Sequence, residues 1–264
     1  MKPKVLQLFA AGINCDRELA FAFRSAGAEV EEIHIRELIQ NPERILDCQL
    51  FAIPGGFTYG DDLGAGRILS VEVVAFLRDT LLQFHEQGGS IFGVCNGFQV
   101  LVKAGLLPGI GGVDVSLSWN DTHRFECRWS RLLVDPALGH VLPAHSVLPA
   151  GTAHAEGKLV LGHPDQAQTL ADAGCIALRY ANPEGQATED YPYCPSGSEA
   201  GIAGLISPSG RILGLMPHPE RCLSEQSLPD RGSGAWGDGQ TGIDFFRGLL
   251  SRYLSQAETT ATSS

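Results

Sequence analysis

The sequence predicts an α/β protein with an open, mostly parallel sheet that carries helices on both faces. Three observations favour this fold class. In the first half of the chain, short apolar runs of strand length alternate with segments of helical periodicity. Most of these runs are continuously apolar, as parallel strands buried on both faces are. Two of the loops that follow them carry unusual residues, and loops at the carboxyl ends of parallel strands are where sites form.

The first half contains the strands and helices that define this sheet. Strands are expected at 5–9, 28–35, 50–53 and 90–94, and helices at 16–25, 67–87 and 95–104. Within 67–87 apolar residues recur at steps of three or four, and Gly88-Gly89 ends the helix. The run 28–35 alternates apolar and charged residues, which is typical of a strand exposed on one side.

The second half predicts extra β structure and no second domain. Strands are expected at 113–119, 125–134, 158–161, 176–180, 202–207 and 212–215. A glycine-rich loop at 222–240 and a closing helix at 241–254 follow. We expect one domain over residues 1–255 and a disordered tail of small polar residues at 256–264.

Composition excludes several classes of protein. Nineteen Lys and Arg against 30 Asp and Glu give the 264-residue chain a net charge of −11. This charge argues against nucleic-acid binding, which needs a basic surface. The chain contains no apolar run of the length that a signal peptide or a membrane span requires. Its seven scattered cysteines include no CxxC pair, which favours reduced thiols, a cytoplasmic location and no metal site.

One cysteine, Cys95, lies where a strand is expected to end and a helix to begin. Gly93 and Gly97 flank it at two residues on either side, and glycines there relieve the crowding of a sharp strand-to-helix turn, as in a nucleophile elbow. The helix N-terminus favours a thiolate and offers free amides for an oxyanion. The alternative is an inert cysteine buried in the core.

His218 is the histidine best placed to serve as the base. It follows the strand expected at 212–215, and Pro217 and Pro219 hold the backbone extended around it. Residues two apart in an extended segment point the same way, so Glu220 can orient the imidazole. The alternative is a rigid loop with a surface ion pair between Glu220 and Arg221.

Three short motifs together resemble the class I, or triad, glutamine amidotransferases. They are Pro54-Gly55-Gly56, the Gly93-x-Cys95-x-Gly97 turn and His218-Pro219-Glu220. The longer strings 14–16, 54–66 and 93–99, with support from 124–129 and 154–157, resemble the glutaminase subunits of phosphoribosylformylglycinamidine synthases. The resemblance extends over about residues 4–254 and implies a flavodoxin-like fold.

The resemblance assigns a role to each matching residue. It implies Cys95 as nucleophile, His218 as base and then acid, and Glu220 as the orienting carboxylate. The backbone amides of Gly56 and Asn96 would form the oxyanion hole. The remaining positions implied to contact substrate are Gln99, Gly55 and Phe57. The chain departs from the pattern at Ala11, Ile13 and Ala155, so Asn14 and Cys15 are not taken as site residues.

The resemblance also implies partners. L-glutamine is the expected substrate, and the ammonia would pass to an ATP-dependent large synthetase subunit, in a complex that includes a small accessory subunit. The chain has no GxxxxGK[ST] phosphate loop and no length left for an ATP-binding domain. We therefore expect no cofactor in this chain, with ATP and Mg²⁺ on the partner.

Two other classes stay open. An amidotransferase or cysteine hydrolase of the same fold, such as a γ-glutamyl hydrolase or a PfpI-type protein, would act on another γ-glutamyl substrate. Such proteins lack the extended 54–66 string. A catalytically silent scaffold is the other alternative, and it has no physical need to keep Cys95, His218 and Glu220 together.

Overall fold

The computed structural model describes residues 2–231 and 233–261. Among them, nine strands form the main sheet, in the spatial order β2-β1-β3-β4-β11-β10-β9-β6-β7, and β5 and β8 form a small separate sheet. In chain order the strands are β1 (Lys4–Phe9), β2 (Glu29–His34), β3 (Leu50–Ile53), β4 (Ser90–Val94), β5 (Val115–Ser118), β6 (Glu126–Val134), β7 (Val147–His154), β8 (Lys158–Leu161), β9 (Ile176–Ala181), β10 (Ile202–Ile206) and β11 (Ile212–Leu215).

The main sheet has a parallel half and an antiparallel half. The five strands from β2 to β11 in the spatial order are parallel to their neighbours, and the pairs from β11 to β7 are antiparallel. The central strands β3, β4 and β11 are buried along their whole length. The predicted α/β fold is confirmed: the strands of the first half with β11 form the open parallel sheet, and the added β structure extends it with antiparallel strands.

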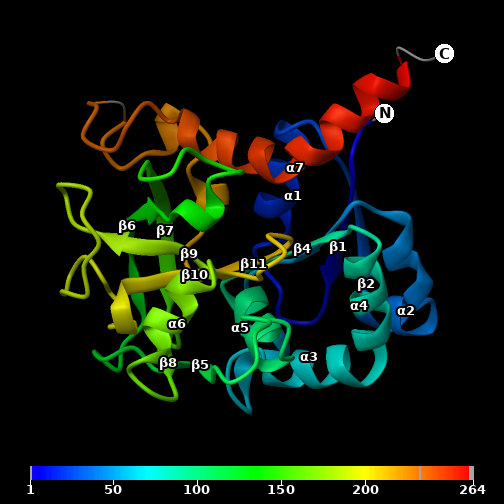
Figure 1. Ribbon diagram of the computed structural model, residues 1–264, viewed down its shortest axis with the longest axis horizontal. Helices are drawn as coiled ribbons and strands as arrows, with labels where there is room; N and C mark the ends of the chain where they lie inside the picture. The colour runs from blue at the N-terminus through cyan, green and yellow to red at the C-terminus, as the bar shows by residue number, and fades with distance from the viewer. Residues whose placement is uncertain (1, 232, 262–264) are drawn as a thin grey trace.

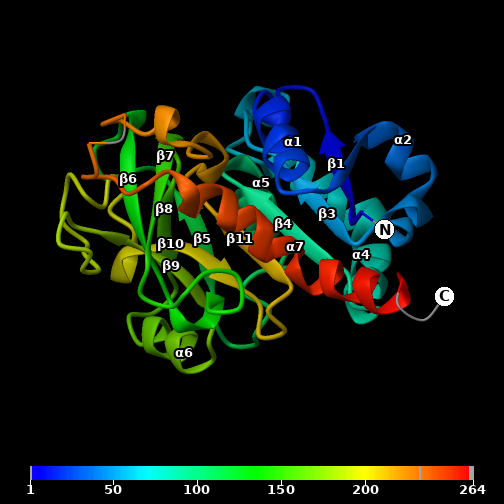
Figure 2. The ribbon, with the colours of Figure 1, turned by 90° about the horizontal axis from the view of Figure 1, so that it is seen from above.

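Helices cover the parallel half on both faces. The α-helices in the described residues are α1 (Asp16–Ser25), α2 (Ile35–Gln40), α3 (Arg67–Glu72), α4 (Arg78–Glu86), α5 (Asn96–Lys103), α6 (Gln166–Asp172) and α7 (Gln240–Ala261). Of these, α6 lies beside the antiparallel half (Figure 1). In Figure 1, α1 and α7 lie above the sheet, and α3 and α5 lie below it. Figure 2, seen from above, shows α7 crossing the molecule over the central strands.

An aromatic cluster fixes α1 and α7 against β4. Phe23 of α1, Phe92 of β4 and Phe246 of α7 pack edge to face in pairs with ring centroids 5.1 to 6.2 Å apart. Each such pair contributes about 0.5–1.5 kcal/mol beyond the burial of its apolar area. Phe245 extends the cluster along β4. The strand that leads into Cys95 is therefore held between two helices by buried aromatic side chains.

The predicted strands and helices of the parallel half are confirmed with small shifts at their ends. The helix expected at 67–87 consists of α3, a π-helical turn at Val73–Leu77 and α4. Three elements were not predicted by the sequence pattern: α2 in the first half of the chain, and β7 and α6 in the second half.

The C-terminal helix is longer than expected. The sequence predicts its end at residue 254, whereas α7 continues to Ala261, because the segment 255–261 is rich in residues with acceptable helix propensity and has no Gly or Pro. Residues 262–264 of the predicted disordered tail lie outside the described residues. The domain boundary at 255 stays a prediction.

No helix within the described part of the chain has the length and apolar character needed to cross a membrane.

Candidate active site

Three neighbouring parallel strands end at the candidate site. β3, β4 and β11 lie side by side and lead into Gly55, Cys95 and His218 respectively. A Cβ atom on Gly55 would lie 2.8 Å from Cε1 of His218 and 3.2 Å from Cβ of Cys95. The two side chains therefore meet over Gly55, and only a residue without a side chain fits beneath them.

Cys95 occupies the sharp turn that its flanking glycines predict. Its backbone angles are φ 53° and ψ −110°, a conformation that costs a residue with a Cβ of order 1–3 kcal/mol. A Cβ on Gly97 would lie 2.0 Å from the carbonyl oxygen of Ile53, and one on Gly93 would lie 2.7 Å from the carbonyl oxygen of Gly97. Both glycines are thus required for α5 to start directly behind the thiol.

His218 and Glu220 form a buried pair beside this turn. Nδ1 of His218 lies 2.6 Å from Oε1 of Glu220, and the two residues are 1% and 3% exposed. Burial lowers the pKa of His218, but the charge of Glu220 and the charge and hydrogen bonding of Cys95 outweigh it and raise the pKa to about 10. The contact forms across a short 3₁₀ turn, Pro219–Arg221, rather than along an extended segment.

The two backbone amides predicted to form the oxyanion hole belong to Asn96, which follows Cys95, and to Gly56, which follows Gly55. Asn96 is the first residue of α5, so its amide has no acceptor within the helix. Gly56 has φ +143°, and a Cβ there would lie 2.6 Å from the carbonyl oxygen of Gly12. No carbonyl in the described ranges accepts a hydrogen bond from the Gly56 amide.

The side chain of Asn96 clamps the loop that follows Gly56. Its Oδ1 accepts a hydrogen bond of 2.6 Å from the Thr58 hydroxyl, and its Nδ2 donates to Asp61 at 3.1 Å. Asn96 also donates to Oε1 of Gln99 at 3.0 Å, and Nε2 of Gln99 donates to the carbonyl oxygen of Glu156 at 2.5 Å. Both polar ends of Gln99 are therefore engaged inside the protein.

Phe57 lies at the outer edge of the same loop. It is 43% exposed and its ring centroid is 6.3 Å from that of Phe125. Of the residues predicted to contact substrate, Gly55 lies directly beside Cys95 and His218, whereas Phe57 faces the surface and Gln99 is buried in the clamp.

A second group of side chains, which the sequence did not predict, lies against His218. Donor atoms of Cys15, Glu18 and His218 all lie within 4.8 Å of one another. The guanidinium of Arg221 donates to Glu18 at 2.8 and 3.0 Å and to the sulfur of Cys15 at 3.4 Å. The alternative ion pair between Glu220 and Arg221 is wrong, since Glu220 binds His218 and Arg221 binds Glu18. Arg221 already provides the positive charge that a cation would bring to this group.

His154 is a further buried residue at this end of the sheet. It is 3% exposed, and its Nδ1 lies 3.1 Å from Oδ1 of Asn120. Burial first, and then the charge of His218, lower its pKa to about 3, so it is neutral at pH 7. Because Asn120 uses its amide group to donate to two carbonyl oxygens, its oxygen accepts from His154, which fixes the proton on Nδ1.

Two thiols thus lie near one imidazole, and their surroundings differ. Cys95 has the strained turn, the free amide of Asn96 and an electrostatic interaction with the His218 ring. Cys15 precedes α1 with ordinary backbone angles, and its thiol donates to Oδ1 of Asn14 at 3.3 Å. Burial raises the pKa of Cys15 far above its usual range. The geometry favours Cys95 as the nucleophile.

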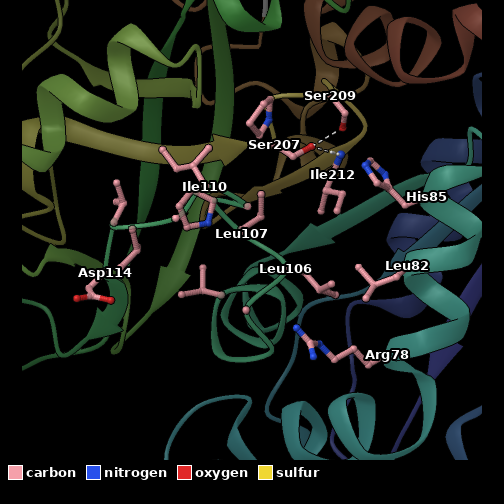
Figure 3. A pocket seen from close by; sticks show the side chains of 18 residues that line it. Arg78, Leu82, His85, Leu106, Leu107, Ile110, Asp114, Ser207, Ser209 and Ile212 are labelled. Carbon is pink, nitrogen blue, oxygen red and sulfur yellow. Dashed lines mark hydrogen bonds between the residues drawn. The ribbon is translucent and has the colours of Figure 1, made fainter.

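A cavity of about 730 Å³ lies at the other end of α5 (Figure 3). Its lining includes Arg78, His85, Ile110 and Ser207, and none of the residues of the candidate site. Because α5 has eight residues, its two ends are about 12 Å apart. The cavity is therefore separate from the thiol and its imidazole.

Residues 2–251 match the model of the CobB/CobQ-like glutamine amidotransferase domain. The chain belongs to this glutamine amidotransferase family. It is accordingly an enzyme of the class that takes nitrogen from glutamine, as the three short motifs predict.

Relatives of known role agree with this assignment. The chain is 45% identical over 233 residues to the phosphoribosylformylglycinamidine synthase subunit PurQ of Dehalococcoides mccartyi, covering 86% of this chain and 89% of the relative. It is 38% identical to the PurQ subunit of Methanococcus maripaludis, covering 87% of each. In the structure of PurLQS from Thermotoga maritima, one chain superimposes with a TM-score of 0.69 at 28% identity, over 96% of this chain and 100% of that one.

Proposed function

We propose that this chain is the glutaminase subunit of a phosphoribosylformylglycinamidine synthase in purine biosynthesis. It hydrolyses L-glutamine to glutamate and ammonia. The observation that carries the proposal is the arrangement of Cys95, His218 and Glu220 at the ends of adjacent strands, with the Nδ1–Oε1 contact of 2.6 Å. The names of the relatives above point to the same reaction.

In the proposed mechanism, the Cys95 thiolate attacks the side-chain amide carbon of glutamine. The imidazolium of His218 then gives its proton to the departing nitrogen, and the C–N bond breaks to release ammonia and leave a glutamyl thioester. Neutral His218 next takes a proton from water, which attacks the thioester. The C–S bond breaks, glutamate leaves, and the Cys95 thiolate and the His218 imidazolium are restored.

The other predicted residues support these steps. The amides of Gly56 and Asn96 hold the negative oxygen of each tetrahedral intermediate. Gly55 leaves room for the substrate beside the thiol. Gln99 and Phe57 contact the substrate. Since Gln99 is bound by Asn96 and Glu156, we expect it to act on glutamine after the clamp rearranges.

The ammonia requires a partner that uses it. We propose that the chain works in a complex with an ATP-dependent large synthetase subunit and a small accessory subunit. The similarity of this chain to part of PurLQS from Thermotoga maritima supports such a complex. ATP and Mg²⁺ would bind to the synthetase, and this chain would carry no cofactor and no metal.

A glutaminase assay on the complex with the synthetase subunit tests the proposal, with two cysteine variants as a matched pair. Cys95→Ala is expected to lose glutamine hydrolysis by at least about 10³-fold, because the triad acts as a unit. Cys15→Ala removes the second sulfur beside Gly55 and is expected to keep most of the activity.

Two outcomes would contradict the proposal. Wild-type rates in Cys95→Ala would exclude Cys95 as nucleophile, and loss of activity in Cys15→Ala alone would assign that role to Cys15. Hydrolysis of other γ-glutamyl compounds in preference to glutamine would favour the alternative of a γ-glutamyl hydrolase.

A further inference from the structure

The side chains of Cys15 and Cys95 both lie against one glycine, Gly55. A Cβ placed on Gly55 would lie 3.3 Å from Sγ of Cys15 and 3.2 Å from Cβ of Cys95. The Cys15 sulfur and the Cys95 Cβ are thus no farther apart than these two distances combined. Because Gly55 carries only hydrogen, its side chain does not separate them.

His218 is within reach of both sulfurs. Its ring interacts with the side chain of Cys95, and one of its nitrogens lies within 4.8 Å of Sγ of Cys15. One imidazole can therefore accept or supply the proton for chemistry at either sulfur. Such a pair, an activated thiol with a second thiol beside it, is the arrangement of a redox-sensitive cysteine with its resolving cysteine.

The surroundings of Cys15 favour its neutral thiol form in the resting site. Burial and the nearby Glu18 carboxylate oppose its ionisation, whereas the guanidinium of Arg221, 3.4 Å from the sulfur, favours it. In the resting site Cys15 is therefore protonated and does not compete for glutamine. When it loses its proton, Arg221 is already in place to stabilise the thiolate.

We propose that Cys15 and Cys95 form a reversible oxidation site, in which a peroxide converts the two thiols to a disulfide and switches off glutamine hydrolysis. The inference rests on the proposed role of Cys95 as the nucleophile. The disulfide protects Cys95 from irreversible oxidation, and a thiol reductant restores the enzyme.

The chemistry needs one peroxide and the shared imidazole. The Cys95 thiolate attacks one oxygen of hydrogen peroxide, the O–O bond breaks, and the departing hydroxide takes the proton of His218 to become water. Cys95 is then a sulfenic acid and His218 is neutral. His218 takes the proton of Cys15, the Cys15 thiolate attacks the Cys95 sulfur, and the displaced hydroxide leaves as a second water with that proton.

The test is mass-spectrometric peptide mapping of the full-length chain after peroxide treatment, together with glutaminase assays on its complex with the synthetase. We expect a disulfide between the peptides that contain residues 15 and 95, loss of activity in parallel, and recovery with dithiothreitol. In Cys15→Ala, peroxide should leave Cys95 as sulfinic acid, and dithiothreitol should not restore activity. Cys127→Ala, which removes an exposed thiol elsewhere, should behave as the wild type.

The outcomes separate this inference from the proposed function. Failure to detect the 15–95 disulfide in the oxidised wild type overturns the inference, as does full recovery of the Cys15→Ala variant, while the glutaminase role of Cys95 would stand. Full activity of untreated Cys95→Ala would overturn the proposed function itself, and with it the basis for the switch.

Discussion

At the scale of single residues, the candidate site depends on how Glu220 acts on His218. Both side chains are buried, so the carboxylate is poorly solvated and its effect on the imidazole is strong. Burial lowers the pKa of His218, and the carboxylate of Glu220 together with Cys95 outweighs it. The consequence is an imidazolium that persists at neutral pH and can protonate the departing nitrogen.

Replacing Glu220 by Gln keeps the shape of this contact and removes its charge. The pKa of His218 should then fall from about 10, and the alkaline limb of the pH profile of kcat/KM should move to lower pH. We expect kcat to fall by about 10²- to 10⁴-fold, as when an orienting carboxylate is neutralised in other triads. Steady-state glutaminase kinetics across the pH range measure both effects. An unchanged alkaline limb would contradict the assignment.

The same pair makes stability depend on pH. The pKa of His218 in the folded protein is raised above its ordinary value of 6.5, so its stabilising effect is complete below that value and is lost as pH rises through about 10. In Glu220→Gln this alkaline loss should be smaller. Urea unfolding of both proteins at pH 7 and at about pH 9.5, a pH chosen within the titration range, measures the difference. Equal alkaline losses in the two proteins would contradict the charge interaction.

At this scale the sequence predicts the site residues that belong to a local motif. It does not predict those that come together only through the fold. Cys95, His218 and Glu220 lie in short strings with recognisable backbone requirements. Arg221 and Glu18 are 203 positions apart, so no local pattern predicts their ion pair. The proximity of Cys15 to His218 has the same origin, as it depends on how β1, β3 and β11 are ordered in the sheet.

At the scale of elements, the position of the Cys95 thiol depends on the close approach of α5 to β3. The helix begins so near the strand that Gly97 has no room for a side chain, since its Cβ would lie 2.0 Å from the carbonyl oxygen of Ile53. This packing fixes the angle between β4 and α5 and forces the strained backbone of Cys95. The strain is held by rigid elements on both sides.

Gly97→Ala should therefore destabilise the protein and impair the site together. We expect a loss of about 1–3 kcal/mol in the free energy of unfolding, typical of overpacking, with a fall in kcat. Gly111→Ala is the matched control, because no atom lies within 4 Å of its Cβ position and its φ is not positive. Chemical denaturation of both variants measures the difference. Equal stability of the two would contradict the close approach.

The sequence pattern failed to predict β7 for an identifiable reason. β7 contains Pro149, Gly151 and small residues in place of an apolar alternation, and proline within a strand is tolerated mainly at the edge of a sheet. β7 occupies that edge. The parallel strands were predictable because each is a short, continuously apolar run bounded by turn residues.

At the scale of the whole molecule, the parallel half supplies the reacting groups and the antiparallel half closes over them. Gly151 of β7 exchanges backbone hydrogen bonds with His218 at 2.7 and 3.2 Å, and the Cys95 sulfur lies 3.8 Å from the carbonyl oxygen of Ala153. Cys95 is only 6% exposed. Glutamine therefore needs a movement of the surrounding segments to reach the thiol.

The loop after Gly56 is the segment suited to this movement. Tyr59, Gly60 and Asp61 all have positive φ, and the loop is held by Asn96 through a few hydrogen bonds. We expect the isolated chain to hydrolyse glutamine weakly and the complex with the synthetase subunit to be strongly stimulated. Glutaminase rates of the chain alone and with its partner measure this. Equal rates would contradict the coupling.

The most direct test of the catalytic centre is labelling with 6-diazo-5-oxo-norleucine, a glutamine analogue that alkylates the nucleophile of the site that binds it. The wild-type complex is treated with the analogue, digested and mapped by mass spectrometry, with excess L-glutamine as the competitor. The adduct is expected on Cys95, with glutamine preventing its formation. An adduct on Cys15, or labelling of Cys95 that glutamine does not reduce, would contradict a glutaminase centre built on Cys95, His218 and Glu220.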